Sequence, residues 1–238
     1  MLCDNETGQC LIDTKKELSP IPERQTEKKA VVIHYVGDPM CSWCWGISQS
    51  VSRIEAFCND HQYQFTLTNG GLRAGGGDAW NASFKSFLRR EWEHISLKTG
   101  QPFSYALLDA EYFNYDTEPA CRAVVSAGLI AKDTKIAFFR ETQRKFYTQS
   151  EDPKKIEFYE SICLTTGINF DDFKKVFTSK FAVAETINEF YKVRHFGVNA
   201  FPTILIEKDS VIKKIASGYV GEKEITTILI ENLSLIHI

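Results

Sequence analysis

The stretch that decides the fold is VVIHYVGDPMCSWCWG, residues 31–46. It opens with β-branched residues of strand length and little polarity, which predicts a buried strand over residues 30–36. The sequence GDP then breaks the strand, and Cys41 and Cys44 follow with two residues between them. We therefore expect this cysteine pair in the loop between a strand and a helix.

The residues after the cysteine pair complete a strand–turn–helix–strand unit. Residues 44–58 carry apolar side chains at helical spacing: Ile47, Val51, Ile54 and Phe57. Residues 63–68 alternate aromatic or aliphatic with polar side chains, which predicts a second strand. The chain thus opens on a βαβ unit, with the cysteines at its first turn.

The position of the cysteine pair predicts thiol–disulfide chemistry. A thiolate is the nucleophile in disulfide exchange, and the free N–H groups at the start of a helix stabilise it. Two intervening residues place Cys44 about one helical turn beyond Cys41, within reach of a mixed disulfide there. We predict that Cys41 is the exposed attacking thiolate and Cys44 the buried resolving thiol.

A structural zinc site and inert packing are the alternatives for this pair. Zinc needs a second pair of cysteine or histidine ligands at short spacing. Cys58, Cys121 and Cys163 are isolated among apolar neighbours on predicted helices, as buried free cysteines commonly are. His34 lies inside the first strand, where we expect a core residue with satisfied hydrogen bonds. We predict no metal.

The middle of the chain differs from both ends. Residues 78–197 show only helical patterns and loops, and strand character then returns before a last helix: residues 203–206, 211–216 and 222–233. A sheet drawn from both ends of the chain, with helices between, predicts an α/β domain interrupted by another domain. We place the α/β domain at residues 30–77 and 198–238, and an all-helical insertion at 78–197.

Residues 1–29 are charged, contain two prolines and lack apolar periodicity, so we predict a poorly ordered tail that holds Cys3 and Cys10. Its start has no apolar run of the secretory kind, which favours a cytoplasmic protein with reduced thiols. A net charge of −3 argues against nucleic-acid binding. No stretch approaches the ~20 apolar residues of a membrane span.

A second signal lies far downstream, in VNAFPTIL at residues 198–205. Pro202 leads a predicted strand, where it need not donate to the ladder, and X–Pro is the peptide bond that is readily cis. A cis bond would turn the Phe201 backbone outward and offer an edge to an extended substrate. An ordinary strand-leading proline is the alternative.

Several of these motifs resemble one family. DPMCSWCWG (residues 38–46), GGLR (70–73), EPACRA (118–123) and FPT (201–203) are similar to the DsbA-like branch of the thioredoxin superfamily. Within it they resemble the FrnE-like group of predicted protein-disulfide isomerases, over about residues 31–230. The resemblance implies a thioredoxin-like fold, a mixed central sheet flanked by helices, interrupted by an all-helical insertion domain.

The resemblance also implies roles for four residues. Cys41 would attack, Cys44 would resolve the mixed disulfide, and Phe201 and Pro202 would contact the substrate, a protein or peptide thiol or disulfide. No bound cofactor is implied, and glutathione would serve as a redox partner. The dipeptide between the cysteines is Ser-Trp, not the Pro-His of the periplasmic oxidase, so an isomerase or reductase fits better than a strong oxidant.

Three other interpretations stay open. Kappa-class glutathione transferases and 2-hydroxychromene-2-carboxylate isomerases share this fold but usually lack the resolving cysteine that is present here. Aromatic residues around Trp43 and Trp45 could instead form a peptide-binding surface. Residues 70–78 (GGLRAGGGD) read as a flexible connector, or as a loop whose N–H groups and Arg73 hold a carboxylate beside the thiol.

Overall fold

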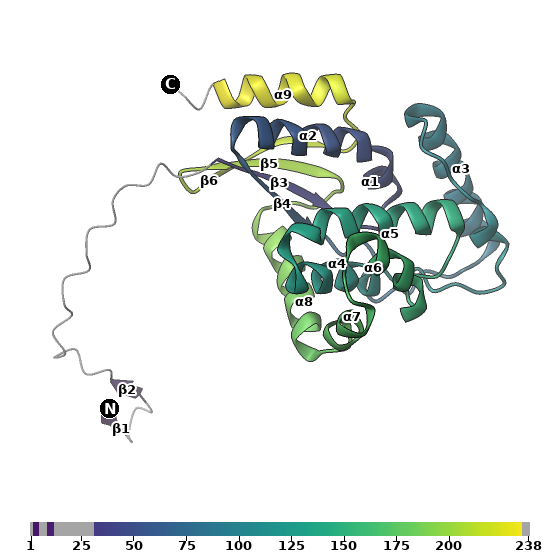
Figure 1. The fold of residues 1–238 in the computed structure, drawn as a ribbon, viewed down its shortest axis with the longest axis horizontal. Helices are drawn as coiled ribbons and strands as arrows, with labels where there is room; N and C mark the ends of the chain where they lie inside the picture. The colour runs from purple at the N-terminus through teal and green to yellow at the C-terminus, as the bar shows by residue number, and fades with distance from the viewer. Residues whose placement is uncertain (1, 5–8, 12–30, 235–238) are drawn as a thin grey trace.

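A computed structural model describes residues 2–4, 9–11 and 31–234, and its centre is a four-stranded mixed sheet (Figure 1). The strand order is β4-β3-β5-β6; β3 and β4 run parallel, whereas β5 is antiparallel to both of its neighbours. The four strands come from both ends of the described chain: β3 (Val32–Gly37), β4 (Gln64–Asn69), β5 (Thr203–Lys208) and β6 (Val211–Ser217). The α/β fold with a mixed sheet is as predicted.

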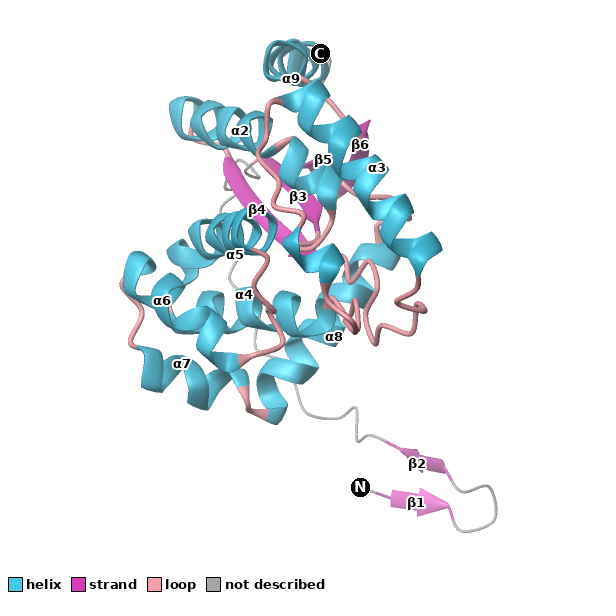
Figure 2. Ribbon diagram, turned by 90° about the vertical axis from the view of Figure 1, so that its right-hand side faces the viewer, coloured by secondary structure: helices cyan, strands magenta, loops and turns pink. Residues whose placement is uncertain are grey.

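Helices cover both faces of the sheet. On one face α2 (Ser48–His61) and α9 (Glu222–Ser234) lie side by side, and the other face carries helices from the middle of the chain (Figures 1 and 2). The short helix α1 (Ser42–Gly46) precedes α2. Because side chains of β3 point alternately to the two faces, both helical layers bury apolar residues against it.

Between β4 and β5 the described chain is helical, as predicted for residues 78–197. It forms α3 (Ala82–Thr99), α4 (Glu118–Ile130), α5 (Lys135–Gln149), α6 (Glu160–Thr166), α7 (Phe170–Phe177) and α8 (Lys180–His195), with 3₁₀ turns at Ala106–Asp109, Lys132–Thr134 and Ile156–Tyr159. One hydrophobic core runs through these helices and the sheet, for example where the rings of Tyr35 and Phe139 meet. The division into two domains stays a prediction.

One predicted helix is divided into two in the structure. The single helix expected over residues 44–58 is broken at Ile47, whose backbone angles (φ −96°, ψ 13°) end α1 before α2 begins. Trp45 of α1 and Val51 of α2 both lie in the core. Before α6, Asp152 accepts the Lys154 N–H (3.0 Å) in a local turn, and a short 3₁₀ turn follows.

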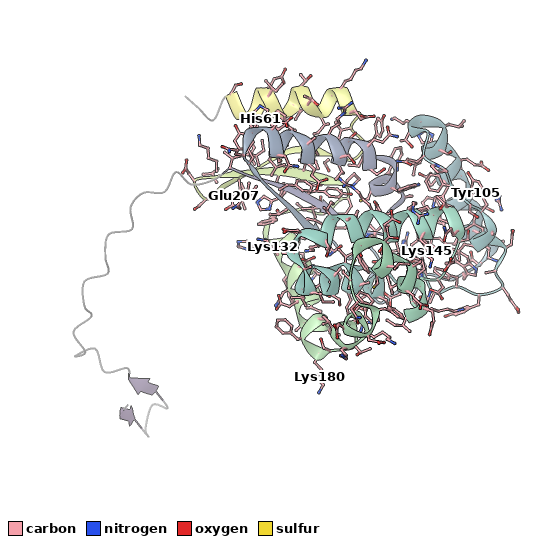
Figure 3. All side chains as sticks on the ribbon, in the orientation of Figure 1. His61, Tyr105, Lys132, Lys145, Lys180 and Glu207 are labelled. Carbon is pink, nitrogen blue, oxygen red and sulfur yellow. The ribbon has the colours of Figure 1, made fainter. Side chains whose placement is uncertain are left out.

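Two buried polar side chains illustrate how the interior satisfies its hydrogen bonds. His34 Nε2 lies 2.9 Å from a Glu207 carboxylate oxygen and Nδ1 lies 2.8 Å from the Thr66 hydroxyl, which confirms it as a satisfied core residue. Lys145, inside the helical layer in Figure 3, donates to the Phe158 carbonyl (2.8 Å) and the Ser161 hydroxyl (3.0 Å). Neither side chain is left for ligand binding.

Most of the predicted N-terminal tail lies outside the described residues. Within it, β1 (Leu2–Asp4) and β2 (Gln9–Leu11) pair antiparallel, with Cys3 opposite Cys10 in the register. In the described part of the chain, no helix is both long and apolar enough to cross a membrane.

Candidate active site

The two cysteines lie where the sequence places them, at the turn from β3 into α1. Cys41 is the residue before α1, with an extended backbone (φ −84°, ψ 117°), and its N–H donates to the Asp38 carbonyl (3.0 Å). Cys44 lies within α1. Both are free thiols, so the pair is in its dithiol form. This is the arrangement in which one sulfur can attack and the other resolve.

The prediction that Cys41 is exposed is wrong, because the structure buries most of this residue. Only 5% of its surface reaches solvent, because its Sγ lies against the backbone of Phe201 and donates to that carbonyl at 3.8 Å. Cys44 is fully buried, as predicted. Little of Cys41 is therefore open to a substrate, and the Phe201 backbone covers part of its sulfur.

The environment of Cys44 keeps it a thiol. Burial raises the pKa of Cys44 well above its ordinary value, and the neighbouring Cys41 sulfur raises it further. The nearby Tyr35 hydroxyl acts in the opposite direction. Cys44 is thus suited to wait protonated until a mixed disulfide forms next to it.

The Phe201–Pro202 peptide bond is cis, as the sequence suggested. Phe201 lies 160 positions from Cys41 along the chain, yet its carbonyl faces the Cys41 sulfur. The Pro202 carbonyl accepts the Gly218 N–H (2.8 Å), which fixes the start of β5 against the end of β6. The structure therefore brings together all four predicted site residues: Cys41, Cys44, Phe201 and Pro202.

Asp38 is a site residue that sequence reasoning missed. It is fully buried, and its carboxylate accepts the N–H groups of Met40 (2.8 Å) and Leu72 (2.7 Å). The Cys121 thiol also donates to it at 3.4 Å. Burial raises the pKa of Asp38. The signal was an acidic residue directly after a buried strand, where the sequence analysis saw only a strand break.

Asp38 joins the cysteine turn to the glycine-rich stretch at residues 70–78. The N–H groups of that stretch are used by other side chains of the protein: Leu72 by Asp38, Arg73 by Thr117, Gly75 by Asp116 and Gly77 by Asn114. The Arg73 guanidinium forms an ion pair with Asp78. These contacts favour the connector interpretation over a carboxylate site built on Arg73.

Gly70 packs directly under the substrate-binding candidate Phe201. A Cβ at position 70 would overlap the Phe201 ring. We expect Gly70→Ala to displace Phe201 from Cys41, to lower the free energy of unfolding by about 1–3 kcal/mol as overpacking does, and to slow disulfide exchange. Urea unfolding and a peptide-disulfide assay measure the two effects. Gly100→Ala, a variant with nothing within 4 Å of the added Cβ, is the control for exchange activity.

Trp45 does not contribute to a surface. It is 7% exposed, its indole N–H donates to the Pro102 carbonyl (3.1 Å), and its ring stacks on Tyr147. The aromatic surface suggested around Trp43 and Trp45 therefore lacks Trp45, which belongs to the core. Trp43 is half-buried at the rim of the site.

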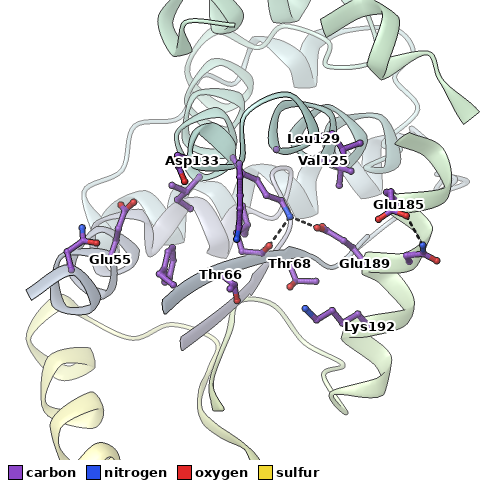
Figure 4. Close-up of a pocket in the computed structure, with 17 residues that line it drawn as sticks. Glu55, Thr66, Thr68, Val125, Leu129, Asp133, Glu185, Glu189 and Lys192 are labelled. Atoms are coloured by element: carbon purple, nitrogen blue, oxygen red, sulfur yellow. Dashed lines mark hydrogen bonds and ion pairs between the residues drawn. The ribbon is translucent and has the colours of Figure 1, made fainter. Parts of the chain in front are cut away.

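A cavity of about 640 Å³ lies apart from the cysteines, along the outer edge of β4 (Figure 4). Lys135 crosses this edge: its ammonium donates to the Leu67 carbonyl (2.9 Å) and pairs with Glu189. Glu189 in turn accepts the Asn69 N–H (2.8 Å). These side chains occupy backbone groups that an added strand would need, so they protect the open edge of the sheet.

No group of three or more histidine, cysteine or acidic side chains in the described ranges lies close enough to hold a metal ion. Cys58, Cys121 and Cys163 are each buried and free, as predicted.

Comparison with known proteins finds solved structures that share this fold. No family model matches the chain. A structure described as a putative protein disulfide isomerase from Nitrosomonas europaea superposes with a TM-score of 0.78 at 30% sequence identity, over 87% of this chain and 99% of that one.

More distant structures share the fold alone. The cytosolic disulfide reductase DsbM from Pseudomonas aeruginosa has a TM-score of 0.70 at 22% identity, over 86% of this chain and 99% of that one, and it has also been solved with GSH. A 2-hydroxychromene-2-carboxylate isomerase has a TM-score of 0.58 at 10% identity, over 86% of this chain and 96% of that one.

Proposed function

The chain belongs to the DsbA-like thioredoxin-fold disulfide oxidoreductases, and on that premise we propose that it exchanges protein or peptide disulfides through Cys41 and Cys44. The observation that carries the proposal is the meeting of two free sulfurs with the Phe201 carbonyl, which lies 3.8 Å from the Cys41 Sγ. Cys41 is the sulfur nearer the surface, so it is the one that a substrate can reach.

The exchange proceeds in two balanced steps. The Cys41 thiolate attacks one sulfur of the substrate disulfide; a Cys41–substrate disulfide forms, and the other substrate sulfur leaves as a thiolate that takes up a proton. Cys44 then loses its proton and attacks the Cys41 sulfur. The Cys41–Cys44 disulfide forms, and the second substrate sulfur leaves as a thiol. The substrate has gained the two electrons that the enzyme dithiol has lost.

Phe201 and Pro202 are the proposed substrate-binding residues. The Phe201 backbone is next to the Cys41 sulfur, so a substrate chain attached to Cys41 must pass along it. The Phe201 side chain is partly buried against a cluster that includes Val198 and Leu205, so we take its backbone as the contact surface. Recognition of backbone suits an enzyme that must accept cysteines in varied sequences.

Reduction or isomerisation with glutathione is the proposed direction, and the cytoplasm the proposed compartment. The structures similar to this chain include a cytosolic reductase solved with GSH. Glutathione would return the Cys41–Cys44 disulfide to the dithiol by the same exchange in reverse. The chain has both sulfurs, Cys41 directly before α1 and Cys44 within it, and the likeness to 2-hydroxychromene-2-carboxylate isomerase is one of fold. We therefore do not favour a glutathione-dependent transferase or isomerase.

Cys44→Ser is expected to trap the intermediate. Without the resolving sulfur, the disulfide between Cys41 and a peptide persists, and non-reducing mass spectrometry should find one peptide per protein.

In the wild type, the rate at which Cys44 resolves the mixed disulfide should rise with pH. The pKa of Cys44 is raised and only its thiolate attacks, so the rate should increase about tenfold per pH unit while the thiol predominates. A wild-type resolution rate that is flat between pH 6 and 8, or a Cys44→Ser protein that never accumulates an adduct, would contradict the proposal.

A further inference from the structure

The rim of the candidate site carries a lysine held by two aromatic rings. Lys98 Nζ lies 4.4 Å from the centre of the Tyr219 ring and 5.7 Å from that of Trp43. The Trp43 ring contacts Tyr219 at a centroid distance of 5.8 Å, and His94 at the same distance. Three elements meet there: α1, the end of α3 and the turn between β6 and α9 (Figure 1).

The backbone connects this rim to the reactive groups at two places. Trp43 stands between the two cysteines in the sequence. Tyr219 follows Gly218, whose N–H donates to the Pro202 carbonyl at 2.8 Å. Phe201, on the other side of that proline, faces the Cys41 sulfur. A substrate chain that runs along Phe201 and Pro202 therefore passes close to the rim.

The charge of Lys98 is not neutralised within the described part of the protein. Its side chain is exposed, and no carboxylate there forms an ion pair with it. Two arginines of the same helix differ, since Arg89 pairs with Asp109 and Arg90 with Glu91. The rings of Trp43 and Tyr219 attract the ammonium without cancelling its charge, so they hold a cation ready for an outside partner.

We propose that Lys98 is a specificity-determining residue that favours substrates with a carboxylate side chain beside the reacting cysteine. The proposal rests on the proposed function, because it assigns a substrate class to the same site. An acidic side chain is the anionic group that a peptide disulfide most readily carries. Bound beside the Cys41–substrate disulfide, it would face the ammonium across the rim and strengthen binding, leaving the chemistry at sulfur unchanged.

The test uses three peptides with one internal disulfide, identical except for Glu, Gln or Lys next to a cysteine, reduced by the enzyme with dithiothreitol as the final reductant. For the wild type we expect kcat/KM to fall in the order Glu, Gln, Lys, with about a three- to tenfold span at low salt. The span should shrink at 0.5 M NaCl, where exposed charges are screened. The change should appear in KM.

Variants of Lys98 separate charge from packing. Lys98→Gln should flatten the order, Lys98→Glu should reverse it, and Lys98→Arg should keep it. Lys192→Gln, which removes an equal charge and a lysine–phenylalanine contact (5.4 Å) on α8, should behave as the wild type. Lys192→Gln should also retain the wild-type rate on the Gln peptide.

Equal wild-type rates on the three peptides, or an unchanged order in Lys98→Glu, would overturn this inference while leaving the redox function standing. An effect confined to glutathione disulfide, with the peptides unaffected, would overturn the assignment to peptide substrates. Failure of the proposed function looks different: the wild type would not reduce even the Gln peptide.

Discussion

Cys41→Ser should abolish the reduction of peptide disulfides, lowering kcat/KM by at least about a thousandfold. A serine hydroxyl is not ionised at neutral pH and cannot form a disulfide, so the first step of the exchange has no nucleophile. Insulin reduction and the Gln peptide assay both measure the loss. Because Cys41 lies at the edge of the core, the variant should stay folded and keep the wild-type far-UV circular dichroism spectrum.

The matched control for Cys41→Ser is Cys163→Ser. Cys163 is fully buried in α6, and burial raises its pKa to about 12. It therefore stays a thiol, out of reach of any substrate, and its replacement should leave the exchange rate unchanged in the folded protein. If Cys41→Ser keeps the wild-type rate, Cys41 is not the attacking group. If the folded Cys163→Ser protein also loses the rate, the loss in Cys41→Ser is not specific to the attacking sulfur.

Asp38→Ala should cause the largest loss of stability at the site. The substitution removes the acceptor of the buried Met40 N–H and of the Leu72 N–H, and a buried group left without a partner costs about 1–3 kcal/mol. Removing a buried carboxylate offsets part of this, so we expect the free energy of unfolding to fall by about 3 kcal/mol. Urea denaturation followed by circular dichroism measures it.

Activity should fall together with stability in Asp38→Ala. Asp38 accepts hydrogen bonds from Met40, the residue before Cys41, and from Leu72 in the glycine-rich stretch. The substitution therefore loosens both segments. Asp109→Ala is the control, because that side chain is exposed and its partner Arg89 is 3.8 Å away. It should change the free energy of unfolding by no more than about 0.5 kcal/mol. A stable, fully active Asp38→Ala protein would show that the carboxylate does not hold the Met40 and Leu72 segments together.

The features that could be predicted from the sequence are those that depend on the pattern of residues close together in the chain. The strand before the cysteines, the turn that holds Cys41 and Cys44, and Pro202 at the entrance to a strand follow from apolar periodicity and from proline geometry, and the structure has all three. The helical character of residues 78–197 also follows from spacing alone. Each of these depends on neighbours within a few residues along the chain.

The features that were missed depend on contacts between distant segments. Cys41 is covered by Phe201, Asp38 is held by Leu72 and Cys121, and no periodicity reports such pairs. The break at Ile47 has the same origin, since a continuous helix satisfies the apolar pattern equally well and only packing selects two shorter ones. Tertiary contacts here override local propensity.

The most direct test of the redox pair is to map the disulfide that the enzyme acquires from a substrate. The reduced protein is mixed with one equivalent of peptide disulfide, its free thiols are alkylated in denaturant, and its peptides are analysed by mass spectrometry. We predict one new Cys41–Cys44 disulfide, with Cys58, Cys121 and Cys163 all alkylated. Reduction of the peptide with Cys41 and Cys44 still recovered as alkylated thiols, or a new disulfide at any other pair, would contradict it.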